Sequence, residues 1–255
     1  MSTSASFIKP DWVAPTHVKA FTTLRQTWGK NGLCFENKIE REHQTQLLTN
    51  LLQLPTPPIW LKQTHGTKLI EALAHNQFNE ADASFASQAQ QVCVVLTADC
   101  LPILLFHQHY PLVAAIHAGW RGLANGIIEL TIEKLSCQFF KKKDSENNFF
   151  KIQAGWTAWL GPAISAKHFV VGSDVYHSFV DKELELKNYF STLDQGKWLA
   201  DLYAIARYKL NKLNITHIYG GQYCTYSQDD LFFSYRRDPG CRGRMASIIW
   251  MQNNS

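Results

Sequence analysis

Continuous apolar runs without alternation mark the clearest strands of this chain, at residues 92–97 and 112–117. Strands that are covered on both faces show such runs, so we expect both near the centre of a sheet. A third apolar run, 103–106, is followed by the polar residues 107–111. This order predicts an antiparallel hairpin between 103–106 and 112–117.

Helical spacing follows the hairpin. From Leu123 onward, apolar residues recur three and four positions apart, and Gly119 and Gly122 stand where the chain must turn from strand to helix. A second amphipathic helix is predicted over residues 200–214. Together with the expected short strands, these elements predict a mixed α/β fold of the α+β class. The short strands are expected at 159–160, 169–171, 217–219, 231–235 and 245–250.

One domain over residues 1–255 is expected, because the chain shows no internal repeat and no long linker rich in Pro, Gly or Ser. The charged run 141–148 fits a surface loop within that fold. A hydrophobic fraction of 45% is sufficient for a sizeable core, which excludes a disordered or fibrous protein.

Charge, hydropathy and cysteine content bear on nucleic-acid binding, membrane association and cellular compartment. The net charge of +4 is not gathered into a long basic block, so no nucleic-acid partner is expected. The longest apolar stretch, 92–106, is interrupted by Asp99 and Pro102, and the first residues lack a signal-peptide core; no membrane association is expected. Six cysteines without a CxxC pair suit a reduced, cytoplasmic protein.

Three side chains that can bind a metal each follow an apolar stretch: His65, Cys100 and His117. Their separations of 35 and 17 residues match no zinc-finger spacing, so a shared site would have to be assembled by the fold. Two imidazoles and a thiolate would leave one position of a tetrahedral Zn²⁺ open for water or substrate, as in catalytic sites.

The same residues also have ordinary interpretations, which spacing alone favours. A single histidine at a strand end is usually hydrogen-bonded for structure, and a cysteine after an apolar strand is usually a small buried hydrophobe. Asp99, next to Cys100, could orient an imidazole or serve as a turn residue.

Several segments resemble the YfiH/YlmD family, also described as multicopper polyphenol oxidoreductase, laccase-like or FAMIN-related. The likeness runs from about Phe21 to Trp250, and its most specific parts are TADC and HAGWRG. The matching strings are WLKQTHG (60–66), ADASFAS (81–87), LTADCLPILL (96–105), AAIHAGWRGLANGII (114–128), LGPAIS (160–165) and FFSYRRDPGCRGRMASIIW (232–250).

The resemblance implies a four-layer α/β/β/α fold with mixed sheets and a zinc site formed by His65, Cys100 and His117. It further implies purine nucleoside phosphorylase activity on adenosine, inosine, guanosine and methylthioadenosine, with adenosine deaminase activity as well. Two departures from the family pattern stand out: residues 21–29 read FTTLRQTWG in place of FTTR and a Gly-Gly-Val-Ser loop, which shifts Arg25 by one position, and Cys241 replaces a common threonine.

Phosphorolysis of a nucleoside requires a site for phosphate and stabilisation of the negative charge that develops on the purine. Arg121, between two glycines beside an expected helix start, is the favoured phosphate contact. Arg236, Arg244 and, more weakly, Arg25 are further candidates, whereas Arg237 fits an ordinary ion pair better. Deamination would need an acid near the metal, for which Asp99 is the candidate, although the HxE and PCxxC signature of zinc deaminases is absent.

Three other functions compete with this one. A multicopper polyphenol oxidase needs many HxH pairs, and this chain has one, His107-Gln108-His109, so a copper oxidase with Cu²⁺ as its cofactor is disfavoured. His65, Cys100 and His117 could still bind Cu²⁺ adventitiously, because copper binds such ligands more tightly than zinc does. Cys100 could instead be a nucleophile activated by His117 or His65, which would make the protein a cysteine hydrolase. For that case the family resemblance implies the editing of peptidoglycan precursors. A non-enzymatic regulator is the third alternative, and the complete ligand set argues against it.

Overall fold

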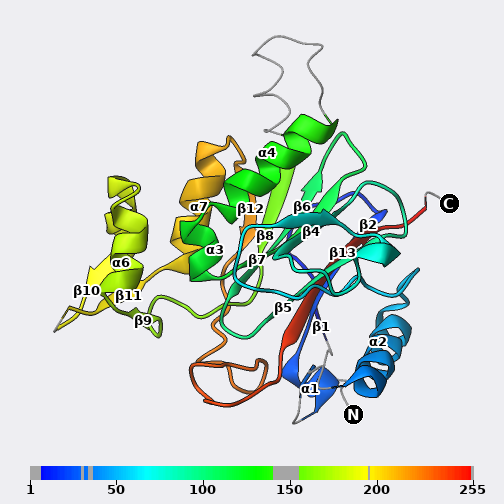
Figure 1. The fold of residues 1–255 in the computed structure, drawn as a ribbon, viewed down its shortest axis with the longest axis horizontal. Coiled ribbons are helices and arrows are strands. Elements are labelled where there is room, and N and C mark those ends of the chain that lie inside the picture. Colours follow the sequence, from blue (N-terminus) through cyan, green and yellow to red (C-terminus); the bar gives the residue numbers. More distant parts are fainter. Residues whose placement is uncertain (1–6, 30–31, 34–36, 140–154, 195, 254–255) are drawn as a thin grey trace.

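The structure is a computed structural model that describes residues 7–29, 32–33, 37–139, 155–194 and 196–253 (Figure 1). The run 141–148, expected as a surface loop, lies outside these residues. The elements are β1 (Phe7–Ile8), β2 (Val18–Thr23), α1 (Arg25–Trp28), α2 (Lys38–Leu52), β3 (Leu69–Glu71), η1 (Ala74–Asn76), β4 (Ala83–Ala86), β5 (Val92–Thr97), β6 (Leu101–His107), β7 (Val113–Ala118), α3 (Trp120–Ala124), α4 (Ile127–Phe139), β8 (Trp156–Leu160), β9 (Val170–Val171), α6 (Ser173–Val180), η2 (Leu184–Tyr189), β10 (Phe190–Thr192), β11 (Trp198–Ala200), α7 (Leu202–Lys212), β12 (His217–Gly220) and β13 (Met245–Met251).

A mixed six-stranded sheet has the strand order β12-β8-β6-β7-β4-β3. Its centre is the antiparallel pair β6 and β7, in which Leu101 faces Ala118 and Phe106 faces Val113. This pairing confirms the predicted hairpin. The outer pairs β12–β8 and β3–β4 are parallel, so the sheet is mixed, as the family resemblance implies.

A second sheet, of four antiparallel strands, has the order β1-β2-β13-β5. It joins the two ends of the described chain, because β13 pairs with β2 on one side and with β5 on the other. The expectation that β5 lies at the centre of a sheet is wrong, since β5 is the last strand in this order. The backbone of Ile59 pairs with its free edge by a parallel bridge to Cys93. β5 is nonetheless mostly apolar because both of its faces are covered: Cys93 and Val95 lie in one core cluster, and Val92 and Val94 lie in another.

The two sheets pack face to face and helices cover their outer sides. Side chains such as Val95, Leu104 and Ile249, all fully buried, form the core between the sheets. Figure 1 shows α2 on the opposite side of the sheets from α4 and α7. Burial of each such Leu or Ile contributes about 1.5–3 kcal/mol, and the continuous apolar pattern of the strands follows from this double coverage. The result is the four-layer α/β/β/α arrangement that the resemblance implies.

The predicted helices are present, with one difference. The helix expected from Leu123 onward is two helices, α3 and α4, because the chain breaks at Gly126, whose φ of +83° is unfavourable for other residues. The helix predicted over 200–214 is α7, and the Asp201 side chain caps it by accepting a hydrogen bond from the Ala204 N–H at 2.9 Å. Within the described residues, every helix is too short or too polar to span a bilayer.

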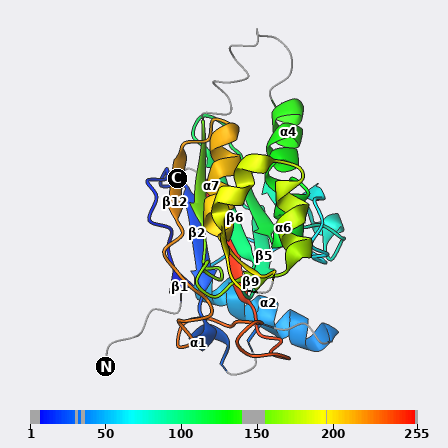
Figure 2. The same ribbon diagram turned by 90° about the vertical axis from the view of Figure 1, so that its left-hand side faces the viewer.

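The strand predicted over 231–235 is wrong. Phe232 and Phe233 are fully buried, but they lie in a long loop between β12 and β13. The backbone of this loop forms turn hydrogen bonds, such as that from the Phe232 N–H to the Gln228 carbonyl, and no strand ladder over the described residues 221–244. Figure 2 shows this loop beside α1 at the lower end of the molecule. Apolar residues here fill a corner of the core without pairing in a sheet. The strand expected at 169–171 is β9, and it pairs with β11 in a small sheet of the order β10-β11-β9. The helices α2 and α6 and the strands β10 and β11 have no counterpart among the predicted elements.

Candidate metal centre

The fold brings His65, Cys100 and His117 together at one end of the six-stranded sheet. His65 lies in the turn before β3, Cys100 directly precedes β6, and His117 is in β7, beside Pro102 of β6. Their ligand atoms all lie within 4.8 Å of one another, and the Cys100 Sγ is 3.8 Å from the His65 Nε2. Tetrahedral zinc bonds of about 2.3 Å to sulfur and about 2.0 Å to nitrogen place such atoms about 3.6 Å apart, so this cluster could hold a metal ion.

Asp82, immediately before β4, contacts two of these ligand segments. Its fully buried carboxylate lies 2.7 Å from the His117 Nδ1 and accepts hydrogen bonds from three successive backbone N–H groups, those of residues 64–66. These bonds stabilise the turn in which His65 adopts a φ of +61°, an unusual value for a residue with a side chain. The pair with Asp82 also directs the His117 Nε2 towards Cys100.

The charges of these groups stabilise one another. Burial alone would raise the pKa of the Cys100 thiol, but the charge and hydrogen bond of His117 and the hydrogen bond of His65 outweigh it and lower that pKa to about 6. Burial would lower the pKa of His117, whereas Cys100 and Asp82 raise it to about 9. Burial likewise opposes ionisation of Asp82, yet His117 and the Gly66 N–H lower its pKa to about 2. A thiolate is the form of cysteine that binds metals.

The metal ligands open into a cavity of about 610 Å³, a size typical of small-molecule sites. Trp120, Phe169 and Ile164 form apolar walls, and the exposed Tyr235 stands at its edge. Gly119 permits this access, because a Cβ there would lie 3.0 Å from the Cys100 Sγ and 3.1 Å from the His65 ring.

Three of the predicted arginines line this cavity: Arg121, Arg236 and Arg244. The Arg121 guanidinium stacks 4.2 Å from the Trp120 ring centroid, and in the described residues none of its N–H groups is bonded to the protein. Arg236 donates one hydrogen bond, at 2.8 Å, to the Val170 carbonyl and lies over Phe169. Arg244 donates to two carbonyls of its own loop.

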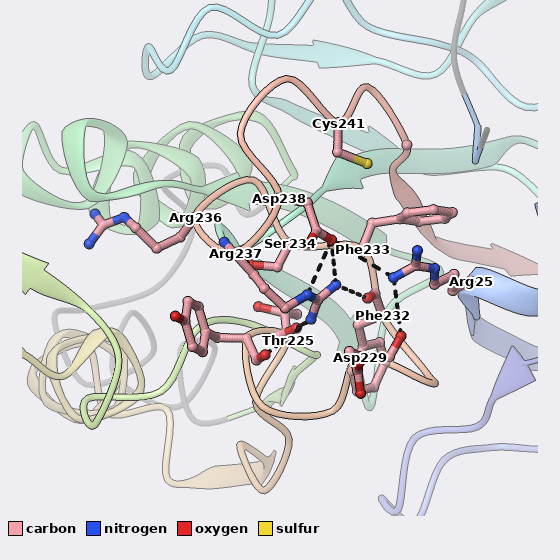
Figure 3. Close-up of polar contacts among 12 residues, drawn as sticks. Arg25, Thr225, Asp229, Phe232, Phe233, Ser234, Arg236, Arg237, Asp238 and Cys241 are labelled. Atoms are coloured by element: carbon pink, nitrogen blue, oxygen red, sulfur yellow. Dashed lines mark hydrogen bonds and ion pairs between the residues drawn. The ribbon is translucent and has the colours of Figure 1, made fainter. Parts of the chain in front are cut away.

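The other two arginines lie elsewhere. Arg25 borders a separate pocket beside α1, where it donates to the Asp229 carbonyl and stacks on Phe233 (Figure 3). Arg237 is tied into the loop by hydrogen bonds to the carbonyls of Thr225, residue 226 and residue 232 and by an ion pair with Asp238. Its role is structural, in line with the sequence-based interpretation.

Asp99 lines the cavity, but its carboxylate does not contact the imidazoles. Its oxygens accept hydrogen bonds from Thr225, Ser234 and the Arg236 N–H. Of the two roles considered for Asp99, orientation of an imidazole does not fit, because Asp82 contacts His117, whereas a turn residue fits its φ of +84° between β5 and β6. Its suggested role as an acid remains a prediction.

The HxH pair is not part of the cluster. His107 is buried against Trp156 at the end of β6, and its Nδ1 accepts a hydrogen bond from the His109 N–H. Among the described residues, His65, Cys100 and His117 form the single group suited to a metal. Cys241 is a free thiol whose carbonyl binds Arg244, so the departure from the family pattern lies beside the cavity.

Sequence reasoning missed Asp82 as a functional residue. A signal was present, since Asp82 is a charged residue between two alanines in the quoted segment 81–87. An acid within such an apolar run is buried only when it is paired. Its partners, however, become visible only when β4 pairs with β7.

Comparison with known proteins identifies the class. A family model described as multi-copper polyphenol oxidoreductase laccase matches residues 36–252. The chain therefore belongs to this laccase-like family, which is the one that its motifs resemble. Two relatives are similar over nearly their whole length. A purine nucleoside phosphorylase of Haemophilus influenzae is 40% identical over 96% of this chain and 99% of that protein, and the purine nucleoside phosphorylase YfiH of Escherichia coli is 35% identical over 97% and 99%.

Solved structures confirm the fold. A protein of Neisseria meningitidis superposes with a TM-score of 0.85 at 37% sequence identity, covering 98% of this chain and 100% of that one. YlmD from Geobacillus stearothermophilus gives a TM-score of 0.82 at 21% identity, covering 99% and 98%. These likenesses show that the whole described architecture is that of the YfiH/YlmD fold.

Proposed function

We propose that this protein is a zinc-dependent purine nucleoside phosphorylase that cleaves adenosine, inosine, guanosine and methylthioadenosine with phosphate. The products are the free base and a ribose 1-phosphate, or its methylthio analogue. The observation that carries the proposal is a single cavity that joins a His–Cys–His cluster to arginines and aromatic walls. The names of the relatives from Haemophilus influenzae and Escherichia coli support the same reaction.

Arginines of the cavity suit the phosphate. Arg121 offers unbonded N–H groups on a guanidinium that lies over the Trp120 ring, and Arg236 keeps donors beyond the one that binds the Val170 carbonyl. A guanidinium binds two phosphate oxygens at once, which also orients the anion for attack on the ribose. Trp120 and Phe169 provide the apolar faces that a purine base requires.

The donor set suits zinc. Two imidazoles and one thiolate match a catalytic zinc site with an open position, and a bound zinc ion would supply a Lewis acid for the negative charge that develops during cleavage. The Cys100 thiolate reduces the net charge of such a site to about +1, and Asp82 holds His117 in the tautomer that can bind. Cu²⁺ could occupy the same ligands, but the further histidines of a multicopper centre are not beside them among the described residues.

Product analysis tests the reaction directly. Purified protein is incubated with adenosine, with and without phosphate, and the products are separated by chromatography. Adenine that forms only with phosphate would support phosphorolysis. Inosine would indicate the deaminase activity that the family resemblance suggests, whereas unchanged adenosine under both conditions would contradict the proposal.

Removal of any ligand should abolish the activity together with the metal. We expect His65→Ala, Cys100→Ala and His117→Ala each to lose bound zinc and phosphorolysis, because two remaining ligands cannot retain the ion. His75→Ala and Cys137→Ala are matched controls, since both residues are exposed and away from the cavity. Metal content is measured by elemental analysis and turnover by adenine release. A Cys100→Ala protein with full activity would rule out this metal centre.

One observation favours a second candidate, a cysteine hydrolase acting on peptidoglycan precursors. The pKa of Cys100 is lowered to about 6 despite burial, because His117 and His65 stabilise the thiolate, as in activated nucleophiles. Metal analysis of protein purified without added metals separates the two mechanisms. About one zinc per chain is expected for the phosphorylase, whereas a metal-free protein that cleaves such a precursor would establish the hydrolase.

A further inference from the structure

We propose, building on the proposed function, that Asp99 is a positioning residue that holds Arg236 at the cavity, next to the proposed metal ligand Cys100. Asp99 would thus connect the metal centre to the phosphate site through one carboxylate. This role differs from that of an acid or base, because it acts through the protein backbone.

The position of Asp99 in the chain is unusual. It lies between β5 and β6, immediately before Cys100, and has a φ of +84°, a region that residues with side chains rarely adopt. Its carbonyl accepts a hydrogen bond from the Ile164 N–H at 3.0 Å, which anchors the turn that follows β8. Such strain persists only where the surrounding contacts enforce it, and it is common at functional sites.

The carboxylate of Asp99 binds two parts of the loop between β12 and β13, one at Thr225 and the other at residues 234–236. Oδ1 accepts a hydrogen bond from the Thr225 hydroxyl at 2.6 Å, and Oδ2 accepts from the Ser234 hydroxyl at 3.0 Å and from the Arg236 N–H at 2.7 Å. Thr225 and Ser234 are fully buried. In the described part of the chain, all hydrogen bonds of this carboxylate run to residues 225–236, so its contacts are those of a structural anchor.

The loop depends on this anchor because it has no regular secondary structure of its own. Arg237 closes the loop from the other side by donating to the carbonyls of Thr225 and residue 232, while its N–H donates to the Ser234 hydroxyl. Figure 3 shows the Arg236 side chain directed away from this Arg237–Asp238 cluster. The backbone at 236 is therefore fixed by Asp99, and the guanidinium remains available to the cavity.

Replacement of Asp99 should loosen the loop and weaken phosphate binding. In Asp99→Asn an NH₂ group replaces one acceptor oxygen, so the bond to the Thr225 hydroxyl must reverse its direction or be lost, and the bonds from Ser234 and the Arg236 N–H no longer run to a charged acceptor. We expect the KM for phosphate to rise about tenfold or more while kcat changes less, since the hydrogen bonds to a charged group are weakened at a distance from the reacting atoms. A general acid or base would instead show a loss in kcat of about 10²-fold or more at an unchanged phosphate KM.

Limited proteolysis tests the positioning role of Asp99 without an assay of enzyme activity. Arg236 is exposed, yet trypsin can cut after it only when the backbone opens locally. We expect cleavage after Arg236 or Arg237, located by mass spectrometry, to be about tenfold faster in Asp99→Asn than in the unaltered protein. Asp230→Asn removes the same charge from an exposed part of the same loop and should leave the cleavage rate and the phosphate KM unchanged.

Ser234→Ala provides the second variant. It removes one partner and leaves the Asp99 carboxylate intact, so a positioning role predicts faster cleavage and a raised phosphate KM, whereas an acid–base role predicts no change. Unchanged cleavage in both Asp99→Asn and Ser234→Ala would overturn the proposal. If the unaltered protein showed no phosphorolysis, the proposed function would fail, and the proteolysis result would still decide the role of Asp99.

Discussion

Asp82 is the residue on which the geometry of the metal centre depends most. One buried carboxylate orients the His117 imidazole and accepts three backbone N–H groups around His65. It thus stabilises a strained turn and a ligand at once. Partners of this kind commonly affect metal affinity 10-fold to 100-fold, since they fix the ring orientation and the tautomer of the ligand.

Asp82→Asn should weaken zinc binding about 10-fold to 100-fold, because the neutral amide cannot accept from all of these donors and no longer supports the imidazole electrostatically. Zinc affinity is measured by competition with a chromophoric chelator. Asp174→Asn, an exposed acid in α6, is the matched control and should leave the affinity unchanged. Equal affinities for the Asp82 variant and the unaltered protein would show that Asp82 supports the fold alone.

Among the elements, those with a continuous apolar pattern were predicted best. β5 has the bounds predicted from the sequence, and β6 and β7 differ from prediction by one or two residues. The pattern failed at 231–235, where the same kind of residues are buried in a loop. Apolar periodicity reports burial, and burial does not distinguish a strand from an irregular segment that packs into the core.

Some contacts between elements are charged pairs, which the apolar pattern of the sequence does not reveal. Glu183, just before η2, accepts a hydrogen bond from the Tyr208 hydroxyl at 2.6 Å and forms an ion pair with Lys212, both residues of α7. Burial alone would raise the pKa of Glu183, but these two partners outweigh it and lower that pKa below 4.5. The carboxylate therefore links η2 to α7 in its charged form.

Glu183→Gln should lower the free energy of unfolding at pH 7 by less than about 1 kcal/mol, since the ion pair is partly exposed to solvent. Because the folded pKa is lowered, the stabilisation is present above pH 4.5 and is lost as the pH falls through the folded value. Urea titrations of both proteins at several pH values should show the difference shrinking below pH 4.5. A difference that grows on acidification would contradict this assignment.

At the scale of the whole molecule, a bound metal would join separate parts of the chain. The ligands come from the turn before β3, the turn before β6 and strand β7, which lie far apart in sequence. An ion that binds only the folded state stabilises it by RT ln(1 + [L]/Kd), or about 4 kcal/mol when the free metal is 1,000 times its Kd.

Chelation should therefore lower the melting temperature. A shift of about 2–4 °C per kcal/mol is expected for a chain of this length, so removal of zinc should reduce Tm by roughly 10 °C. Calorimetry with and without chelator measures the shift, and His117→Ala is the control, since its Tm should not respond to chelator. A shift of equal size in both proteins would place the metal elsewhere.

The sequence by itself determined the class of fold, the main strands and helices, the family and the three side chains that can bind a metal. These features follow from local periodicity, from the chemistry of single residues and from short sequence motifs, all of which can be recognised without knowing the tertiary contacts. Only the tertiary structure decided how these side chains relate in space. Sheet pairing placed Asp82 rather than Asp99 behind His117, put Arg121 at the cavity and Arg25 outside it, and made Asp99 the anchor of a distant loop. Such relations join residues up to 137 positions apart, and no local pattern records them.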